Sequence, residues 1–235
     1  MIHLTPRLQA AADLVPTASV IADIGTDHAY LPLYLVETGK IRRAIASDIH
    51  EGPAERARIH IGQEGKSDSI DVRIGSGLLT LRPGEAEGAV IAGMGGLMIQ
   101  KILEEGAAVA ERMNWFVLQP QNHGGDLRDW LSTHGFTVRK EVLAKEDRML
   151  YQILLAVHGT GRPYHGMERE TGHFEQRRSD PLFFEFLQRL IKKRNFTIQG
   201  VPETTENPLS AEKRLRALEE KKELEDMLWK LESKI

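Results

Sequence analysis

A strand, a glycine-bearing turn and a helix are expected between residues 20 and 37, and this unit constrains the fold most. Residues 20–22 form a short apolar run, Val-Ile-Ala, that is typical of a buried parallel strand. The run is followed by Asp23 and Gly25, and residues 29–37 are rich in helix formers. This order begins a βαβ unit, in which ligands bind beyond the carboxyl ends of the strands. The fold expected is therefore α/β.

The turn lacks the glycine pattern that binds a pyrophosphate. A dinucleotide site requires G-x-G-x-x-G, but Gly25 is followed here by Thr26, Asp27, His28 and Ala29. The Asp27 carboxylate stands where the phosphates would lie, and like charges at close range repel each other in a partly dry cleft. A cofactor with cationic centres and no phosphate, such as S-adenosylmethionine, is favoured over NAD or FAD. The alternative is that Asp27 only caps the following helix.

Composition narrows the class of protein. The chain has 235 residues, of which 41% are hydrophobic, and its length fits one or two globular domains. No signal peptide or membrane span is expected. The absence of cysteine excludes disulfides and thiolate metal sites and predicts a cytoplasmic location. The net charge of −3 gives no general bias toward nucleic acid, so any RNA-binding surface has to be local.

The strand and helix patterns continue through the first two thirds of the chain. Further strands are expected at residues 44–49, 70–74, 87–92, 115–118, 137–144 and 149–157. Helices are expected at residues 6–12, 52–65, 97–113 and 126–134. The last two strands are separated only by residues 145–148, which predicts a hairpin. A parallel sheet with an antiparallel edge follows from this order.

Polar or glycine-rich turns follow several of the expected strands. They contain residues 23–28, Asp48, residues 75–77 and residues 93–96. Parallel strands bring these turns to one edge of the sheet, which makes this edge the expected ligand site. The separation of Asp23 and Asp48 is close to the spacing of about 20 residues at which an acid meets the ribose hydroxyls of a nucleoside. Asp48 is equally consistent with a helix cap.

The composition changes near Gly159. Residues 159–163 resemble a linker by their glycine and proline content, which gives expected domains of 1–160 and 161–235. A helix with a dense apolar stripe begins at residues 180–181, and a charged helix with leucines at four-three spacing covers residues 210–235. Two such helices predict an antiparallel helical hairpin. A second leucine set, containing Leu215 and Leu218, is out of step with the first.

Several motifs resemble one known family. They are DIGTDHAYLP, ASDI-x-EGP-x-x-x-A, IGSGL, IAGMGG, LQP-x5-LR-x-WL and ED-x-x-x-Y. In this order they are similar to the bacterial tRNA (adenine-22, N1)-methyltransferases. The resemblance covers residues 4–155 and is only architectural beyond them. It implies a Rossmann-like S-adenosylmethionine methyltransferase sheet with a C-terminal antiparallel helical (coiled-coil) domain. Ser76 stands where the family usually has aspartate, and Gln121 stands where it has asparagine, although Asn122 is adjacent.

The resemblance implies that the cofactor-binding residues lie at the strand ends. They are Asp23, Gly25, Asp27, His28, Asp48, Ile49, Ser76, Gly77, Gly93 and Met94. The first four would line the methionine side of the cofactor, and Asp48 would hold its ribose. The next three would flank the adenine, and the last two would lie beside the reacting methyl group.

The resemblance also implies which residues meet the target base. They are Asp27, Tyr30, Gly95 and Asn122, together with Gln121. Neutral adenine N1 already carries a lone pair, so the reaction needs alignment and a negative field rather than a base. Asp27 is the candidate for that carboxylate. The Gly-Met-Gly-Gly turn is not the Asn/Asp-Pro-Pro-aromatic element of the adenine N6-methyltransferases.

His28 has two interpretations. It could be a metal ligand or a base, or a histidine that packs against the protein. No second ligand stands at H-x-x-x-H or H-x-H spacing, so packing is favoured and no metal site is expected.

Five basic residues are candidates for RNA binding. Arg7 stands in a segment that resembles the start of the family and would close the cleft, and a cluster at one helix end contains Arg189, Lys192, Lys193 and Arg194. The cluster is either a solvated charged face or a set of phosphate contacts that orient tRNA.

The function expected is S-adenosylmethionine-dependent methylation of N1 of an adenine in tRNA, with no obligate protein partner evident. A small-molecule methyltransferase with a helical dimerisation domain is the alternative. A non-catalytic nucleotide-sensing module is a third possibility, and an NAD-dependent enzyme is disfavoured by Asp27 and the missing glycines.

Overall fold

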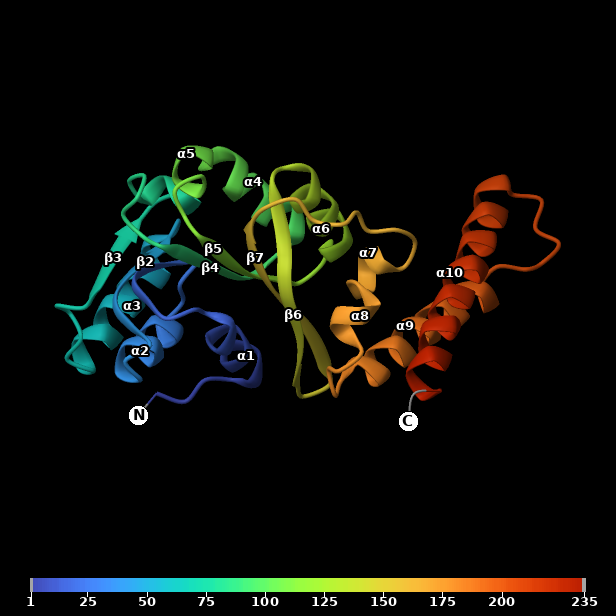
Figure 1. The fold of residues 1–235 in the computed structure, drawn as a ribbon, viewed down its shortest axis with the longest axis horizontal. Helices are drawn as coiled ribbons and strands as arrows, with labels where there is room; N and C mark the ends of the chain where they lie inside the picture. The colour runs from blue at the N-terminus through green and yellow to red at the C-terminus, as the bar shows by residue number, and fades with distance from the viewer. Residues whose placement is uncertain (1, 234–235) are drawn as a thin grey trace. The chain divides into compact units, whose positions relative to one another are not determined.

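The computed structural model describes residues 2–233. The chain forms two compact units, which meet in sequence between Arg162 and Pro163. This division lies two residues from the one expected from the linker composition. We call the first the sheet unit and the second the helical unit (Figure 1).

The sheet unit contains a seven-stranded sheet with the order β3-β2-β1-β4-β5-β7-β6. The parallel strands are β1 (Ala18–Ile24), β2 (Ile41–Asp48), β3 (Ile70–Ile74), β4 (Gly88–Met94) and β5 (Trp115–Pro120). β6 (Phe136–Glu146) and β7 (Met149–His158) form a hairpin, and β7 runs antiparallel to β5. The predicted parallel sheet with an antiparallel edge is confirmed.

Helices cover both faces of this sheet (Figure 1). They are α1 (Pro6–Leu14), α2 (Tyr30–Glu37), α3 (Glu51–Gln63), α4 (Gly96–Glu105), α5 (Ala107–Ala110) and α6 (Gly124–Thr133). Successive strand residues point to opposite faces, so Ile21 packs in the core with α1, α2 and α3, whereas Ala22 packs in the core with α4, α5 and α6. Both cores hold the strands in register, which fixes the positions of the strand ends.

The single helix expected over residues 97–113 is divided at Gly106. A Cβ at Gly106 would lie 2.4 Å from Cβ of Leu78. Leu78 belongs to a short 3₁₀ helix, Gly77–Thr80, that the sequence pattern did not predict. The close packing of these two segments explains why a glycine interrupts the helix here.

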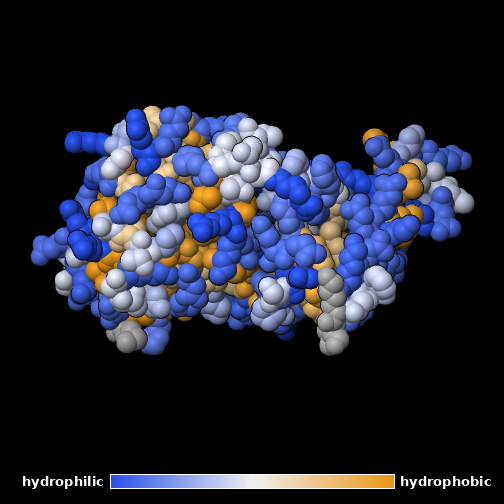
Figure 2. All heavy atoms as spheres, viewed as in Figure 1, coloured by the Kyte–Doolittle hydropathy of each residue, from blue (hydrophilic) through white to orange (hydrophobic). Residues whose placement is uncertain are grey.

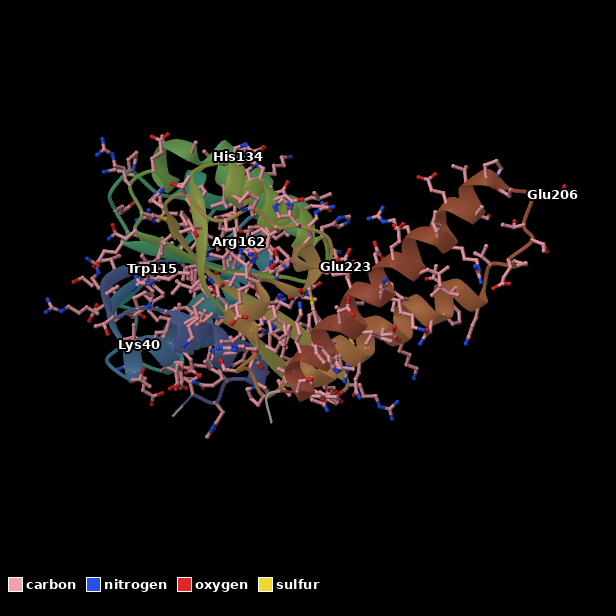
Figure 3. All side chains as sticks on the ribbon, turned by 45° about the vertical axis from the view of Figure 1, so that its right-hand side comes forward. Lys40, Trp115, His134, Arg162, Glu206 and Glu223 are labelled. Carbon is pink, nitrogen blue, oxygen red and sulfur yellow. The ribbon has the colours of Figure 1, made fainter. Side chains whose placement is uncertain are left out.

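The helical unit contains α7 (Glu168–Thr171), α8 (Phe174–Arg177), α9 (Phe183–Gln199) and α10 (Pro208–Glu232). The side chain of Asn207 caps α10 by accepting from the backbone N–H of Leu209 and Ser210. α9 and α10 run side by side, with Glu206 in the loop that joins them and Glu223 along α10 (Figure 3). The expected hairpin is present.

The two leucine sets of α10 face different ways. Leu224 is fully buried against the hairpin core, while Leu215 and Leu218 are exposed. The second set is therefore a separate outward face of the same helix.

Hydrophilic side chains cover much of the face seen in Figure 2, with hydrophobic patches between them. Within the described residues, none of the helices combines the length and the apolar character needed to cross a membrane.

Candidate functional site

The predicted turns meet at one edge of the sheet. The backbone N–H groups of Gly25 and Thr26 donate to the carbonyl oxygen of Ser47, at 2.8 and 2.9 Å. The N–H of Gly75 donates to the carbonyl oxygen of Asp48 at 2.9 Å. These bonds join the ends of β1, β2 and β3, so the sequence inference of a common edge is confirmed.

Two hollows open at this edge. The first, which we call the apolar hollow, has a volume of about 220 Å³. Its lining residues come from the ends of β1, β2 and β3, from Met94 and from one face of α4: Ile24, Gly25, Ser47, Asp48, Ile49, Gly75, Ser76, Gly77, Met94, Met98 and Ile102. Apart from Asp48 and the two serines, these residues offer apolar side chains or bare backbone.

The second, which we call the polar hollow, has a volume of about 270 Å³. Its lining residues come from α1, the end of β1 and its turn, the start of α2, the end of β4 and the loop after β5: Arg7, Leu8, Asp23, Gly25, Thr26, Asp27, Tyr30, Leu31, Ala92, Gly93 and Gln121. The hollow thus contains two acids and one guanidinium group.

Gly25 lines both hollows, and Met94 lies against it. A Cβ at Gly25 would lie 2.1 Å from Cε of Met94, and the φ of +78° at this residue also favours glycine. The Met94 side chain therefore lies at the boundary between the two hollows. A ligand that occupies both hollows would pass Met94 at this boundary.

Asp23 provides a buried carboxyl group in the polar hollow. Its exposure is only 7%. Burial raises the pKa of the Asp23 carboxyl from 3.8 to about 6, the hydroxyl of Thr26 lowers it, and the nearby Asp48 carboxylate raises it further. A cation bound beside Asp23 would favour its ionised form.

Asp27 is an exposed, paired acid. Its Oδ1 accepts from Nη2 of Arg56 on α3 at 3.0 Å and from Nε at 3.2 Å. The Asp27 side chain is 62% exposed. It borders the polar hollow as expected, but the pairing with Arg56 was not predicted and it reduces the negative field that Asp27 supplies.

His28 packs against other rings. Its ring stacks on Tyr30 with centroids 5.5 Å apart, and its carbonyl oxygen accepts from Nδ1 of His60 at 2.6 Å. His28 is not among the residues that line either hollow. The described residues contain no group of three or more side chains placed to hold a metal ion. The ring contact with Tyr30 and the bond from His60 favour the packed interpretation of His28.

The glycines at and just beyond the end of β4 have different surroundings. Gly93 lines the polar hollow, with a φ of +80°. A Cβ at Gly95 would lie 2.8 Å from Oδ1 of Asn122, and one at Gly96 would lie 2.3 Å from the carbonyl oxygen of His123. The loop after β5 therefore fills the space at Gly95 and Gly96.

The same packing changes the expectation for the loop after β5. Gln121 lines the polar hollow, while Asn122 does not and lies against Gly95 instead. Neither Gly95 nor Asn122 lines the apolar hollow or the polar hollow. Their contact with the target base stays a prediction, and Gln121 is the member of the predicted set after β5 that borders the polar hollow.

Arg7 is held in the wall of the polar hollow. Its Nη1 donates to Oε1 of Gln119 at 2.9 Å, and its guanidinium lies 5.7 Å from the centre of the Tyr151 ring. Oε1 of Gln119 also accepts from the N–H of Gly93 at 3.0 Å. Arg7 thus closes one side of the hollow, as expected, and is not a free surface cation.

The sequence reasoning missed some residues of this site. Gln119 was not singled out, although a polar residue at the end of an apolar strand is the same signal that marked Asp23 and Asp48. Met98 and Ile102 were also missed. Their spacing of four places them on one face of α4, and this spacing could have indicated a wall of the site.

The basic cluster of α9 is divided by the fold. Arg194 is 5% exposed and donates to Glu170 at 2.6 Å and to Glu220 at 2.7 Å. The expectation that Arg194 binds RNA is wrong, because its guanidinium is buried between two carboxylates. Lys192 and Lys193 are exposed, and no ion pair of theirs is found within residues 2–233. Arg189 is partly exposed and bonds Glu185 at 2.6 Å.

Residues 4–154 match the family described as "Methyltransferase domain". The chain is 40% identical over 158 residues to the tRNA (adenine(22)-N(1))-methyltransferase of Bacillus subtilis, and the match covers 67% of this chain and 66% of that protein. It thus spans slightly less than two thirds of that relative.

Solved structures are similar over nearly the whole chain. The B. subtilis M1A22 tRNA methyltransferase superposes with a TM-score of 0.86 at 29% identity, covering 97% of this chain and 100% of that one. An M. capricolum relative, solved with the cofactor product S-adenosyl-homocysteine, superposes with a TM-score of 0.83 at 25% identity, covering 96% and 99%.

Proposed function

This chain belongs to the methyltransferase family that includes the bacterial tRNA (adenine-22, N1)-methyltransferases, and we propose from this that it methylates N1 of adenine 22 in tRNA. The proposed methyl donor is S-adenosylmethionine, since the M. capricolum relative binds S-adenosyl-homocysteine, the cofactor product. A substrate of this kind is consistent with the cytoplasmic location expected from the composition.

The observation that carries the proposal is the pair of joined hollows at the strand ends. The apolar hollow offers Ile49 and Met98 to a flat apolar ring and the Asp48 carboxylate to ribose hydroxyls. The polar hollow offers the Asp23 carboxyl to a cation and the Arg7 guanidinium to a carboxylate. A nucleoside joined to a zwitterionic amino acid matches both halves, and S-adenosylmethionine has this composition.

The residues of the polar hollow then have separate tasks. Asp23 attracts the cationic amino acid part, while Arg7, held by Gln119, receives its carboxylate. A side chain at Gly25 would collide with Met94 at the boundary between the hollows, and Gly93 leaves its part of the polar hollow without a side chain. The bound cofactor supplies a methyl group on a sulfonium centre.

The target adenine has to be aligned with the methyl group but does not have to be deprotonated. Its N1 lone pair is available without loss of a proton, so in-line alignment is the main requirement. Tyr30, which is 41% exposed, and Gln121 border the mouth of the polar hollow and are placed to contact the base. Asp27 and Asp23 supply the negative field that favours the cationic product.

Lys192 and Lys193 are the proposed phosphate contacts in the helical unit. They are exposed and adjacent on α9, and no acid is found paired with them within residues 2–233. Such contacts orient RNA without reading its sequence.

Methylation of an unmodified tRNA transcript tests the proposal. We expect reverse transcription to stop at adenine 22 after incubation with the protein and S-adenosylmethionine. A transcript with guanosine at that position is the control and should give no stop. A stop at a residue other than an adenine, or binding of S-adenosylmethionine without any methylation of tRNA, would contradict the proposal. The latter result would favour a small-molecule methyltransferase.

A further inference from the structure

A third hollow lies in the helical unit. It has a volume of about 490 Å³, within the range of small-ligand sites. Two aromatic rings, two basic side chains and two aliphatic residues form most of its lining: Phe174, Phe184, Arg178, Lys230, Pro181 and Leu231. We propose that this hollow binds one unpaired nucleotide of the tRNA substrate. The inference rests on the proposed function and adds a contact to it.

The aromatic side chains make a surface for a flat ring. Phe183 is fully buried, and its ring centre lies 6.1 Å from that of Phe174, which fixes Phe174 against the core. Phe184, the next residue on α9, is 38% exposed and faces the hollow instead. Any base stacks on an aromatic ring through its π-face, so such a surface binds bases with little regard to sequence.

The basic side chains suit the phosphate of the same nucleotide. Lys230 is exposed near the end of α10. Arg178 lies 3.1 Å from the carboxylate of Glu175, with the two side chains 42% and 70% exposed. An ion pair this exposed contributes little, so Arg178 can exchange Glu175 for a phosphate at small cost.

Asp180, an acidic residue in the lining of this hollow, opposes phosphate binding only weakly. Oδ1 of Asp180 accepts from the N–H of Leu182 at 2.9 Å, which directs that oxygen to the start of α9. Cations beside exposed aromatic rings match an RNA segment with a free base. An apolar helix of a protein partner would use the rings but would leave Arg178 and Lys230 without a role.

Substitution of Phe184 tests the stacking contact. We expect Phe184→Ala in the full chain to raise the Kd for tRNA about 5- to 100-fold, because base stacking is lost. Leu215→Ala is the control. Leu215 on α10 is 58% exposed and does not line the hollow, so its removal should change the Kd less than about twofold.

Salt dependence separates the two kinds of contact. Phe184→Ala should weaken binding by the same factor at every salt concentration. Arg178→Ala should lower the slope of log K against log salt by about one, because one phosphate contact is lost. The affinity for S-adenosylmethionine should stay at the wild-type level in both variants, because neither residue lines the apolar hollow or the polar hollow.

Phe184→Tyr keeps the ring and provides a second test if Phe184→Ala fails to fold. It should bind tRNA as the wild type does, whereas Phe184→Leu should bind weakly while preserving an apolar side chain. Equal affinities for Phe184→Leu, Phe184→Tyr and wild type would overturn the inference. If the wild type methylates tRNA in that case, the inference fails alone; if it does not methylate tRNA, the proposed function has failed as well.

Discussion

The Asp27 carboxylate is paired with the Arg56 guanidinium, with Oδ1 lying 3.0 Å from Nη2. The pair joins the turn after β1 to α3, and both side chains are well exposed, at 62% for Asp27 and 46% for Arg56. At this exposure it contributes little to folding. The main effect of this ion pair is on the polar hollow, where it orients one oxygen of the Asp27 carboxylate and weakens the negative field of that group.

Asp27→Asn should therefore slow methyl transfer without unfolding the protein. We expect the single-turnover rate to fall roughly 100-fold, the loss typical of removing one preorganised electrostatic contact. Arg56→Ala keeps the Asp27 carboxylate, strengthens its field and removes its orienting partner, so these effects oppose each other and the rate should stay within about tenfold of the wild-type rate. A wild-type rate for Asp27→Asn would assign the field to Asp23 instead.

Asp23 should make the sheet unit less stable as the pH rises from about 4 to 6. Its pKa is 3.8 when unfolded and about 6 when folded, so the folded state binds the proton more tightly. The cost of the buried charge is absent below about pH 4 and complete above about pH 6, where it reaches about 3 kcal/mol. In urea unfolding at pH 8, Asp23→Asn should be more stable than the wild type by up to that amount. Asp68→Asn is the control: Asp68 is exposed, so its substitution should leave the stability unchanged.

The same group should make cofactor binding depend on pH. The proton on Asp23 competes with the cationic ligand, so the affinity for S-adenosylmethionine should rise with pH and level off above about pH 6. Below that pH, binding should release a proton, which calorimetry in buffers of different ionisation enthalpy detects. Asp23→Asn should bind weakly with no such pH dependence; an unchanged pH profile in this variant would assign the titration to another group.

Local sequence was sufficient to predict the sheet edge. The strands are short apolar runs, and each is followed by a polar or glycine-rich turn, so Asp23, Asp48 and Gly77 could be placed together without a structure. The parallel order determined the rest, because it brings carboxyl ends to one side. These inferences needed only the order of the elements.

Contacts between side chains that lie far apart in the sequence could not be predicted in this way. Arg56 meets Asp27 across 29 residues, and Arg128 on α6 is fully buried against Glu141 of β6. Arg194 follows Lys193 in the same basic stretch of α9. The Arg194 side chain is nevertheless buried against Glu170 and Glu220, whereas Lys193 is exposed. Spacing along one helix does not tell which face another helix will cover.

The glycine pair after β4 illustrates the same limit and gives a further prediction. Gly96→Ala would place Cβ 2.3 Å from the carbonyl oxygen of His123, so the loop that carries Gln121 has to move. We expect a loss of about 1–3 kcal/mol in the free energy of unfolding and weaker binding of S-adenosylmethionine. Gly62→Ala on α3 is the control, because a Cβ there has nothing within 4 Å, and it should stabilise by about 0.5–1 kcal/mol. Equal stabilities in urea would contradict the packing described.

Arg194 and Lys192 should respond in opposite ways to substitution. Arg194→Met removes the cation that Glu170 and Glu220 share, although Glu220 keeps its bond to Arg216. These acids are 40% and 21% exposed, so the helical unit should lose about 1–3 kcal/mol, less than for a fully buried pair. Lys192→Ala should leave stability within about 0.5 kcal/mol and lower the slope of log K for tRNA against log salt by about one. Calorimetric unfolding and binding at several salt concentrations measure both effects. If Arg194→Met kept its stability and lowered the salt slope, Arg194 would be a phosphate contact, and its burial between the two acids would not describe the protein in solution.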